Sequence, residues 1–385
     1  MFDLFVKFVR ETFGETDGFI PLHEPRFTGN EKKYVNDAID STFVSSVGQY
    51  VDRFEEQIRN YTGASYAIAT VNGTAALHIA LVLAGVKRDD LVLTQPLSFI
   101  ATTNAIAYTG AEPCFIDVDL NTLSLSPEKL AQFLQSQTDV RDGACYHVAS
   151  GKRVSACVPM HTFGHPALID AIVQLCTAHH IPVVEDAAES LGSTYRGQQT
   201  GTFGRLGTYS FNGNKTITCG GGGMVVTNDE TLGKLGKHLT TQAKVPHKWE
   251  FNHDQIGYNY RLPNLNAAMA CAQMEQLDAF IASKQRLAGM YQTFFDAFPC
   301  HFIQQPTDSQ SNYWLNSILL NNRQERDEFL DYTNSRGIMT RPVWTLLTEL
   351  PMFRHSLRDD TANAQHIADR LVNIPSSVIS KWKTN

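Results

Sequence analysis

Several features that restrict a protein to one class of function are missing from this chain of 385 residues. No apolar run approaches the roughly 18 residues that a membrane-spanning helix needs. No run of basic residues occurs, and the net charge of −7 disfavours a nucleic-acid-binding surface. We therefore expect neither a membrane segment nor a nucleic-acid partner.

Disulfide and export signals are also missing. The chain has seven cysteines, an odd number, without a CxxC pair, which is typical of reduced and mostly buried thiols. Residues 1–16 alternate apolar and charged residues at helical spacing, and Asp3, Lys7 and Arg10 interrupt any signal-peptide core. We predict an amphipathic N-terminal helix, packed on its own chain or on a partner subunit, in a cytoplasmic protein.

Two phosphate-binding motifs do not occur. GxGxxG does not follow the first predicted strand and GxxxxGK[ST] is missing, so the dinucleotide-binding and P-loop classes lose support. His161 and His165 lie close together, but no cysteine or carboxylate stands at ligand spacing from them. We predict no metal site and interpret His161 as a hydrogen-bonded structural residue.

What the chain does contain is a regular alternation of apolar, β-rich segments with helical patterns. The strand-like segments are 66–71, 91–99, 113–119, 154–164, 181–186, 206–211 and 222–228. This order predicts an α/β fold with a mostly parallel central sheet. A long, bent helical pattern over 264–298 and shorter pieces after it predict a smaller α+β domain. We place the large domain at 1–250 and the small C-terminal domain at 251–385.

Two residues in this pattern suggest a particular cofactor. Lys215 follows the strand-like segment 206–211 and precedes the turn Gly220–Gly223, and a buried lysine there can become a neutral nucleophile and later a base. Asp186 ends segment 181–186, at the sheet edge where ligands bind; alone it fits a helix N-cap better, and only together with Lys215 does it favour a cofactor. Pyridoxal phosphate (PLP) requires such a pair: a lysine that forms an imine and an acid beside the pyridine nitrogen.

Other residues fit the remaining parts of the same cofactor. Gly73 and Thr74 open a helix after segment 66–71, where backbone N–H groups suit a phosphate, although threonine is also a common N-cap. Ser210 can add a hydroxyl. Phe99 can lie flat on the pyridine ring, and core packing explains it about as well. The residues together favour a PLP site.

The chain also resembles a known family, from about residue 20 to its C-terminus. The segments VNGTAALHIAL, LSFIATTNAI, FIDVD, VVEDAAESLG, YSFNGNKTITCGGGGM and GYNYRLPNLNAA are similar, in this order, to the DegT/DnrJ/StrS family of PLP-dependent sugar aminotransferases. The resemblance implies the aspartate aminotransferase-like fold (PLP fold type I). It also implies an imine at Lys215, an Asp186–pyridine contact, a phosphate held by Gly73, Thr74 and Ser210, and ring stacking by Phe99.

The same resemblance implies a homodimer with shared active sites, because Asn259 would reach the phosphate in the neighbouring subunit. Two positions depart from the family pattern. Glu189 stands where the family usually has a glutamine that contacts the phenolic oxygen of the cofactor, so its carboxyl group must carry a proton or point elsewhere. Gly220–Gly223 replaces the family's GEGG and makes that turn more permissive.

The segments FIPLHEPRFTGNEKKY, STFVSSVGQYVDRFE and VPMHTFGHP resemble the transaminases of bacillosamine and legionaminic acid biosynthesis. That branch implies glutamate-dependent amination at C4 of a nucleotide-linked 4-keto-6-deoxy-N-acetylhexosamine, giving a 4-amino-4,6-dideoxy-N-acetylglucosamine for bacterial surface glycans. We expect UDP as the nucleotide, with GDP as the alternative.

Substrate contacts are the least specified part of the site. Ser46 and Tyr50 in one loop and Arg341 and Trp344 in another are candidates, but a surface salt bridge explains Arg341 and core packing explains Trp344 equally well. Two other functions stay open. A PLP-dependent sugar dehydratase would carry histidine at the lysine position, which Lys215 disfavours, and a non-catalytic protein would bind PLP or a sugar nucleotide in a regulatory role.

Overall fold

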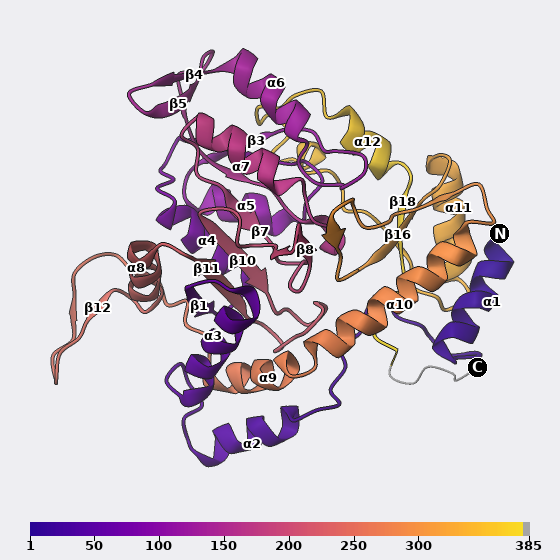
Figure 1. The fold of residues 1–385 in the computed structure, drawn as a ribbon, viewed down its shortest axis with the longest axis horizontal. Helices are drawn as coiled ribbons and strands as arrows, with labels where there is room; N and C mark the ends of the chain where they lie inside the picture. The colour runs from indigo at the N-terminus through magenta and orange to yellow at the C-terminus, as the bar shows by residue number, and fades with distance from the viewer. Residues whose placement is uncertain (380–385) are drawn as a thin grey trace.

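The computed structural model describes residues 1–379 and is organised around one central sheet (Figure 1). Its strands lie in the order β1-β11-β10-β7, and bridges from Cys157 to Val183 and from Met160 to Asp186 join β7 to the order β6-β2-β3. All these strands run parallel except β11, which is antiparallel to β1 and β10. The predicted α/β fold with a mostly parallel sheet is therefore confirmed. The strands are β1 (Tyr66–Thr70), β2 (Leu91–Thr94), β3 (Glu112–Phe115), β6 (Arg153–Val158), β7 (Val184–Asp186), β10 (Leu206–Ser210) and β11 (Gly223–Thr227).

Helices cover both faces of this sheet, because successive side chains of a buried strand point to opposite sides. On one face Ile68 joins an apolar cluster with α4, α5 and α8, and on the other Ala67 and Ala69 pack against α3 and α9. Near β2 and β3, helices α6 and α7 cover this second face. The helices are α2 (Glu31–Asp40), α3 (Gln49–Thr62), α4 (Gly73–Leu83), α5 (Ile100–Tyr108), α6 (Pro127–Gln137), α7 (Ile169–Ala178), α8 (Glu230–Thr240) and α9 (Asn264–Met274).

The C-terminal part contains a second, antiparallel sheet with the order β14-β16-β18-β17. The predicted bent helix over 264–298 is two helices, because the chain leaves α9 at Met274 and begins α10 at Leu277. The elements of this part are α10 (Leu277–Phe295), α11 (Arg323–Asn334), α12 (Ala362–Ala368), β14 (His301–Phe302), β16 (Asn316–Leu319), β17 (Arg341–Pro342) and β18 (Leu371–Ile374).

The remaining elements are short connections. The hairpin of β12 and β13 extends away from α8 and the central sheet (Figure 1). The others are β4 (Thr138–Arg141), β5 (Ala144–His147), β8 (Thr194–Tyr195), β9 (Gln198–Gln199), β12 (Lys244–Val245), β13 (Asn252–His253), β15 (Ser309–Gln310), η1 (Thr162–Gly164) and η2 (Leu347–Glu349). Among residues 1–379, no helix is both long and apolar enough to cross a membrane.

The N-terminal helix α1 (Phe2–Phe13) lies beside α10 and α11 rather than on the central sheet (Figure 1). Its apolar face contributes Phe5 and Val9 to a buried cluster that also contains Tyr291 and Phe329. α1 thus packs with the C-terminal elements, although we counted it in the large domain. The division near residue 250 stays a prediction, and positions 380–385 of the predicted small domain lie outside the described residues.

We predict that Phe5→Ala lowers the free energy of unfolding by about 3 kcal/mol, the usual effect of truncating a buried phenylalanine. Phe5 is 0% exposed, whereas its neighbour Leu4 is 55% exposed. Leu4→Ala is therefore the matched control and should change stability by less than about 0.5 kcal/mol. Urea denaturation of both variants measures the difference, and equal losses would contradict the docking of α1.

Candidate active site

A cavity of about 300 Å³ opens at the carboxyl ends of the parallel strands β7 and β10, beside the N-termini of α4 and α5. Ligands bind at this edge of an open α/β sheet. Seven of the predicted cofactor residues line the cavity, together with the substrate candidate Trp344: Gly73, Thr74, Phe99, Asp186, Glu189, Ser210 and Lys215. Residues that are far apart in the sequence therefore meet at one place.

The carboxylate of Asp186 is buried in the wall of this cavity and held by two hydrogen bonds. Its Oδ2 accepts from the Thr102 hydroxyl at 2.8 Å and its Oδ1 from the Ala188 amide at 3.2 Å. A turn, not the expected helix, follows β7, so Asp186 is not a helix N-cap. These contacts fix the carboxylate toward the cavity, as an acid beside a pyridine nitrogen requires.

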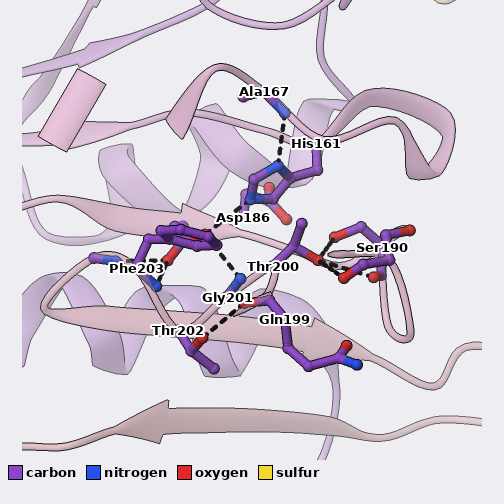
Figure 2. Close-up of polar contacts among 12 residues, drawn as sticks. His161, Ala167, Asp186, Ser190, Gln199, Thr200, Gly201, Thr202 and Phe203 are labelled. Carbon is purple, nitrogen blue, oxygen red and sulfur yellow. Dashed lines mark hydrogen bonds and ion pairs between the residues drawn. The ribbon is translucent and has the colours of Figure 1, made fainter. Parts of the chain in front are cut away.

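The preceding residue, Glu185, points to the opposite face of β7 and braces the strand from behind. Its carboxylate accepts hydrogen bonds from the backbone amides of Gly201, Phe203 and Gly204 at 2.8, 2.7 and 2.6 Å, and lies 2.9 Å from Nε2 of His161. Figure 2 shows the imidazole of His161 turned toward Ala167, whose amide donates to Nδ1 at 3.0 Å. Because Nδ1 accepts, Nε2 carries the proton and donates to Glu185, so His161 is a structural residue.

The N-terminus of α4 has the features of an anion site. The N-cap is Asn72, whose side chain accepts from the Ala75 amide at 2.8 Å, and not Thr74. The amides of Gly73 and Thr74 donate to no atom of the described chain and are available to a phosphate. A Cβ at Gly73 would lie 2.8 Å from Cβ of Ser210, so only glycine lets the helix approach β10 this closely.

Lys215 lies in the turn after β10 with its side chain 14% exposed. Its Nζ is 3.2 Å from Oε1 of Glu189 and 4.1 Å from the centre of the Trp314 ring. The indole N–H of Trp314 donates to the carbonyl of Asn214 at 2.6 Å, which ties this ring to the turn that carries Lys215. These contacts hold the amine at the wall of the cavity, where it can reach a bound carbonyl group.

Glu189 is buried and faces Lys215, so this departure from the family pattern lies inside the site. Its other oxygen, Oε2, accepts from the Phe163 amide at 2.9 Å. Burial raises the pKa of Glu189 to about 7, although the charge of Lys215 and the Phe163 hydrogen bond act in the opposite direction. A carboxyl group with this pKa can hold or release a proton near neutral pH.

Two residues of the site have no counterpart in our sequence interpretation. Thr102 lies only three residues after Phe99, at the start of α5. Because we had already placed Phe99 at the sheet edge beside the cofactor, its neighbourhood in the sequence could have identified Thr102 as a further candidate. Trp314 lies about a hundred positions from the turn it contacts, in a segment before β16, and no local pattern connects the two.

Three substrate candidates do not reach the cavity within one chain. Tyr50 is buried and its hydroxyl donates to Asp37 at 3.2 Å, so it does not line the cavity of its own chain. Ser46 lines a separate cavity of about 230 Å³, together with Arg261. Arg341 is exposed on β17 and donates to the carbonyl of Thr340 and the side chain of Asn334, and it forms no salt bridge with any of residues 1–379.

The fourth candidate, Trp344, forms part of an aromatic wall. Its ring centre lies 5.1 Å from that of Phe163 and 6.1 Å from that of the half-exposed Phe99. Phe99 and Trp344 both line the cavity, which leaves them accessible to a planar ring or a sugar. Asn259 is not part of this wall and accepts from Arg261 of its own chain.

The glycines after Lys215 have unequal roles. Gly220 adopts a φ of 83°, and a Cβ at Gly223 would lie 2.3 Å from the carbonyl oxygen of Asn72, so both positions require glycine. At Gly221 the nearest atom to an added Cβ is 3.7 Å away. The position where the family has glutamate therefore has room for a side chain, and the turn keeps its shape without one.

Among the described residues, no group of three His, Cys, Asp or Glu side chains could hold a metal ion.

Comparison with known proteins identifies close relatives. The model of the DegT/DnrJ/EryC1/StrS aminotransferase family matches residues 25–381. A GDP-perosamine synthase of Escherichia coli O157:H7 is 38% identical over 358 residues, 93% of each chain. EpsN of Bacillus subtilis (strain 168), a putative pyridoxal phosphate-dependent aminotransferase, is 36% identical over 93% of this chain and 90% of its own. The structure of the aminotransferase TlmJ from Streptoalloteichus hindustanus matches with a TM-score of 0.84 at 24% identity, covering 93% of this chain and 94% of TlmJ, which confirms the fold.

The raised pKa of Glu189 predicts a pH-dependent stability. The pKa of Glu189 is about 7 in the folded protein and has the ordinary value of 4.5 in the unfolded chain. Between pH 4.5 and pH 7 the folded protein therefore binds more protons than the unfolded chain. As a result, the free energy of unfolding falls as the pH rises through this range. We predict that Glu189→Gln removes this fall, which is about 3 kcal/mol.

Urea denaturation of the cofactor-free protein at about pH 5 and about pH 8 measures this difference. The control is Glu56→Gln, at an exposed position of α3, which should leave the pH dependence unchanged. Parallel stability curves for Glu189→Gln and the natural protein would show that Glu189 is not the titrating group.

Proposed function

The chain belongs to the DegT/DnrJ/EryC1/StrS aminotransferase family, a family of PLP-dependent sugar aminotransferases, and from this premise we propose that it aminates C4 of a nucleotide-linked 4-keto-6-deoxy sugar with glutamate as the donor. The observation that carries the proposal is the meeting of Lys215, Asp186 and the α4 N-terminus in one cavity. A lysine, an acid and an anion site in this arrangement meet the chemical demands of PLP.

The residues present fit the cofactor without a change in the fold. The free amides of Gly73 and Thr74, with the Ser210 hydroxyl beside them, would hold the phosphate. Asp186 would keep the pyridine nitrogen protonated, and Phe99 would cover one face of the ring. When bound there, PLP supplies an electron sink for the carbon that loses its proton.

The proton transfers belong to the chain's own residues. Lys215 must be neutral before it can act as a nucleophile or a base, and Glu189 at 3.2 Å is placed to take the proton that Nζ gives up. With glutamate bound, the neutral Nζ would take the proton from Cα and pass it to the cofactor carbon that receives the nitrogen. With the keto sugar bound in the second half-reaction, Nζ would take a proton back from that carbon and deliver it to C4 of the sugar. Two half-reactions at one site predict ping-pong kinetics.

The nucleotide and the sugar are the finer part of the proposal. We propose a UDP-linked N-acetylhexosamine, because the quoted N-terminal segments resemble the bacillosamine and legionaminic acid branch. The relatives support the alternative, because proteins from Escherichia coli and Vibrio cholerae at 38% and 34% identity are named GDP-perosamine synthases. A panel of UDP- and GDP-linked 4-keto sugars, with the amino sugar detected by mass spectrometry, distinguishes the two.

We predict that Lys215→Ala lowers the rate of the glutamate half-reaction at least about a thousandfold, because one amine serves as nucleophile, acid and base. The measurement mixes pure, PLP-loaded protein with glutamate alone and follows the release of 2-oxoglutarate over time, whose final amount should equal the number of active sites in the natural protein. Lys234→Ala, at an exposed position of α8, is the matched control and should release the full amount. A non-catalytic binding protein would release none, and an active Lys215→Ala variant would refute the assignment of this residue.

We further propose a homodimer in which Asn259 completes the partner's phosphate site. Asn259 lies outside its own cavity, and the hairpin before it exposes Trp249 and Phe251. We predict that Lys215→Ala and Asn259→Ala, each weakly active or inactive alone, recover about a quarter of the natural activity when refolded as a mixture. Half of the dimers are then mixed, and one of their two sites has both residues intact. No recovery in dimers that mass spectrometry shows to be mixed would refute sharing.

A further inference from the structure

Lys284 is a lysine that the proposed chemistry does not use, in the middle of α10 and 0% exposed. Its Nζ donates to two backbone carbonyls, that of Trp314 at 3.1 Å and that of Ser376 at 2.5 Å. Within the described chain no carboxylate pairs with it. A fully buried amine without a counter-ion is unfavourable, so its position requires a reason other than packing.

The uncharged form of the Lys284 amine fits its surroundings. Burial lowers the pKa of Lys284 to about 7, so the neutral form is readily populated. A neutral amine has two N–H bonds, and two carbonyl oxygens face it. Without the amine, both carbonyls would be buried without a donor, which costs about 1–3 kcal/mol for each unsatisfied group.

Both carbonyls lie at the ends of strands in the C-terminal sheet. Trp314 precedes β16, and Ser376 follows β18. The Ser376 hydroxyl accepts from the amide of Asn316 at 2.7 Å, and its own amide donates to the carbonyl of Leu22 at 2.6 Å. Lys284 thus fastens α10 to two neighbouring strand ends that are already joined to each other.

Trp314 connects this anchor to the candidate active site. Its carbonyl is held by Lys284, its amide donates to Oδ1 of Asn312 at 2.8 Å, and its indole N–H donates to the carbonyl of Asn214. The ring fixed in this way lies 4.1 Å from Nζ of Lys215. Of the three polar groups that fix Trp314, the carbonyl is the one that depends on α10.

From this chain of contacts we infer that Lys284 is a positioning residue for Lys215, acting through the main chain and the ring of Trp314. The inference rests on the proposed function in one respect, the role of Lys215. The contacts from Lys284 to Trp314 and from Trp314 to Lys215 are separate observations that do not depend on that role.

Lys284→Met tests the inference, because methionine is similar in length and apolar but cannot donate to either carbonyl. In the PLP-loaded protein we expect kcat of the glutamate half-reaction to fall about tenfold, since small displacements of a reacting group have large effects on rate. KM for glutamate should change less than about twofold. The midpoint of the pH titration of the bound cofactor's absorbance should shift as well, and backbone amides of 212–216 should exchange with solvent about tenfold faster.

A control separates positioning from general loss of stability. Leu287, one turn further along α10, is also fully buried, and it contacts neither carbonyl through a polar atom. Leu287→Ala should lower the unfolding temperature at least as much as Lys284→Met, but leave kcat, the absorbance titration and exchange at 212–216 within twofold of the natural protein. Equal effects of the two variants on these readouts would overturn the inference.

A double variant tests the route through Trp314. When Trp314→Ala has removed the ring, adding Lys284→Met should lower kcat less than about twofold further, because nothing is left to position. A full tenfold loss in that background would show that Lys284 acts by another path. If Lys284→Met does not fold, Lys284→Leu, which also has no hydrogen-bond donor, replaces it with the same expected directions. Should Lys215→Ala stay active, the proposed function fails, whereas the exchange rates at 212–216 still decide whether Lys284 orders this turn.

Discussion

The candidate site depends on the hydrogen bonds that the buried carboxylate of Glu185 accepts. This carboxylate accepts hydrogen bonds from three backbone amides of the loop 201–204 and from Nε2 of His161, so it fixes β7 relative to two neighbouring segments. Because side chains alternate along a strand, anchoring Glu185 on one face determines where Asp186 points on the other. The carboxylate that faces the cavity is therefore positioned by the carboxylate that does not.

Charge is distributed unevenly in the cavity that Asp186 faces. Two carboxyl groups, of Asp186 and Glu189, share it with the single amine of Lys215, and the raised pKa of Glu189 is the consequence of burying the second carboxyl group. The α4 N-terminus attracts an anion with amides alone, without adding a formal charge. A phosphate can thus bind at one end of the cavity, while Lys215 exchanges its proton with Glu189 at the other end.

Local features of the chain predicted the part of the site that lies at strand ends. Lys215, Asp186 and Gly73 each follow an apolar segment in sequence, and the parallel sheet brings their strand ends together. The glycine-containing loop around Tyr50 did not reveal that this side chain is buried, because its hydrogen-bond partner Asp37 comes from α2. It could not find Trp314, because the contact with Lys215 depends on how the C-terminal segment returns to the large sheet.

The positions of Trp314 and Trp344 show that the predicted small domain contributes residues to the cavity of the large sheet. Both precede or follow short strands of the C-terminal sheet, yet both line the cavity of the large sheet. A boundary near residue 250 separates them from every other cavity-lining residue in sequence, but no boundary separates them in space. Because Trp314 and Trp344 line the cavity, the proposed function assigns substrate fit in part to the C-terminal segment and proton transfer to groups at the strand ends of the large sheet. The same division explains why family resemblance identifies the chemistry more readily than the sugar.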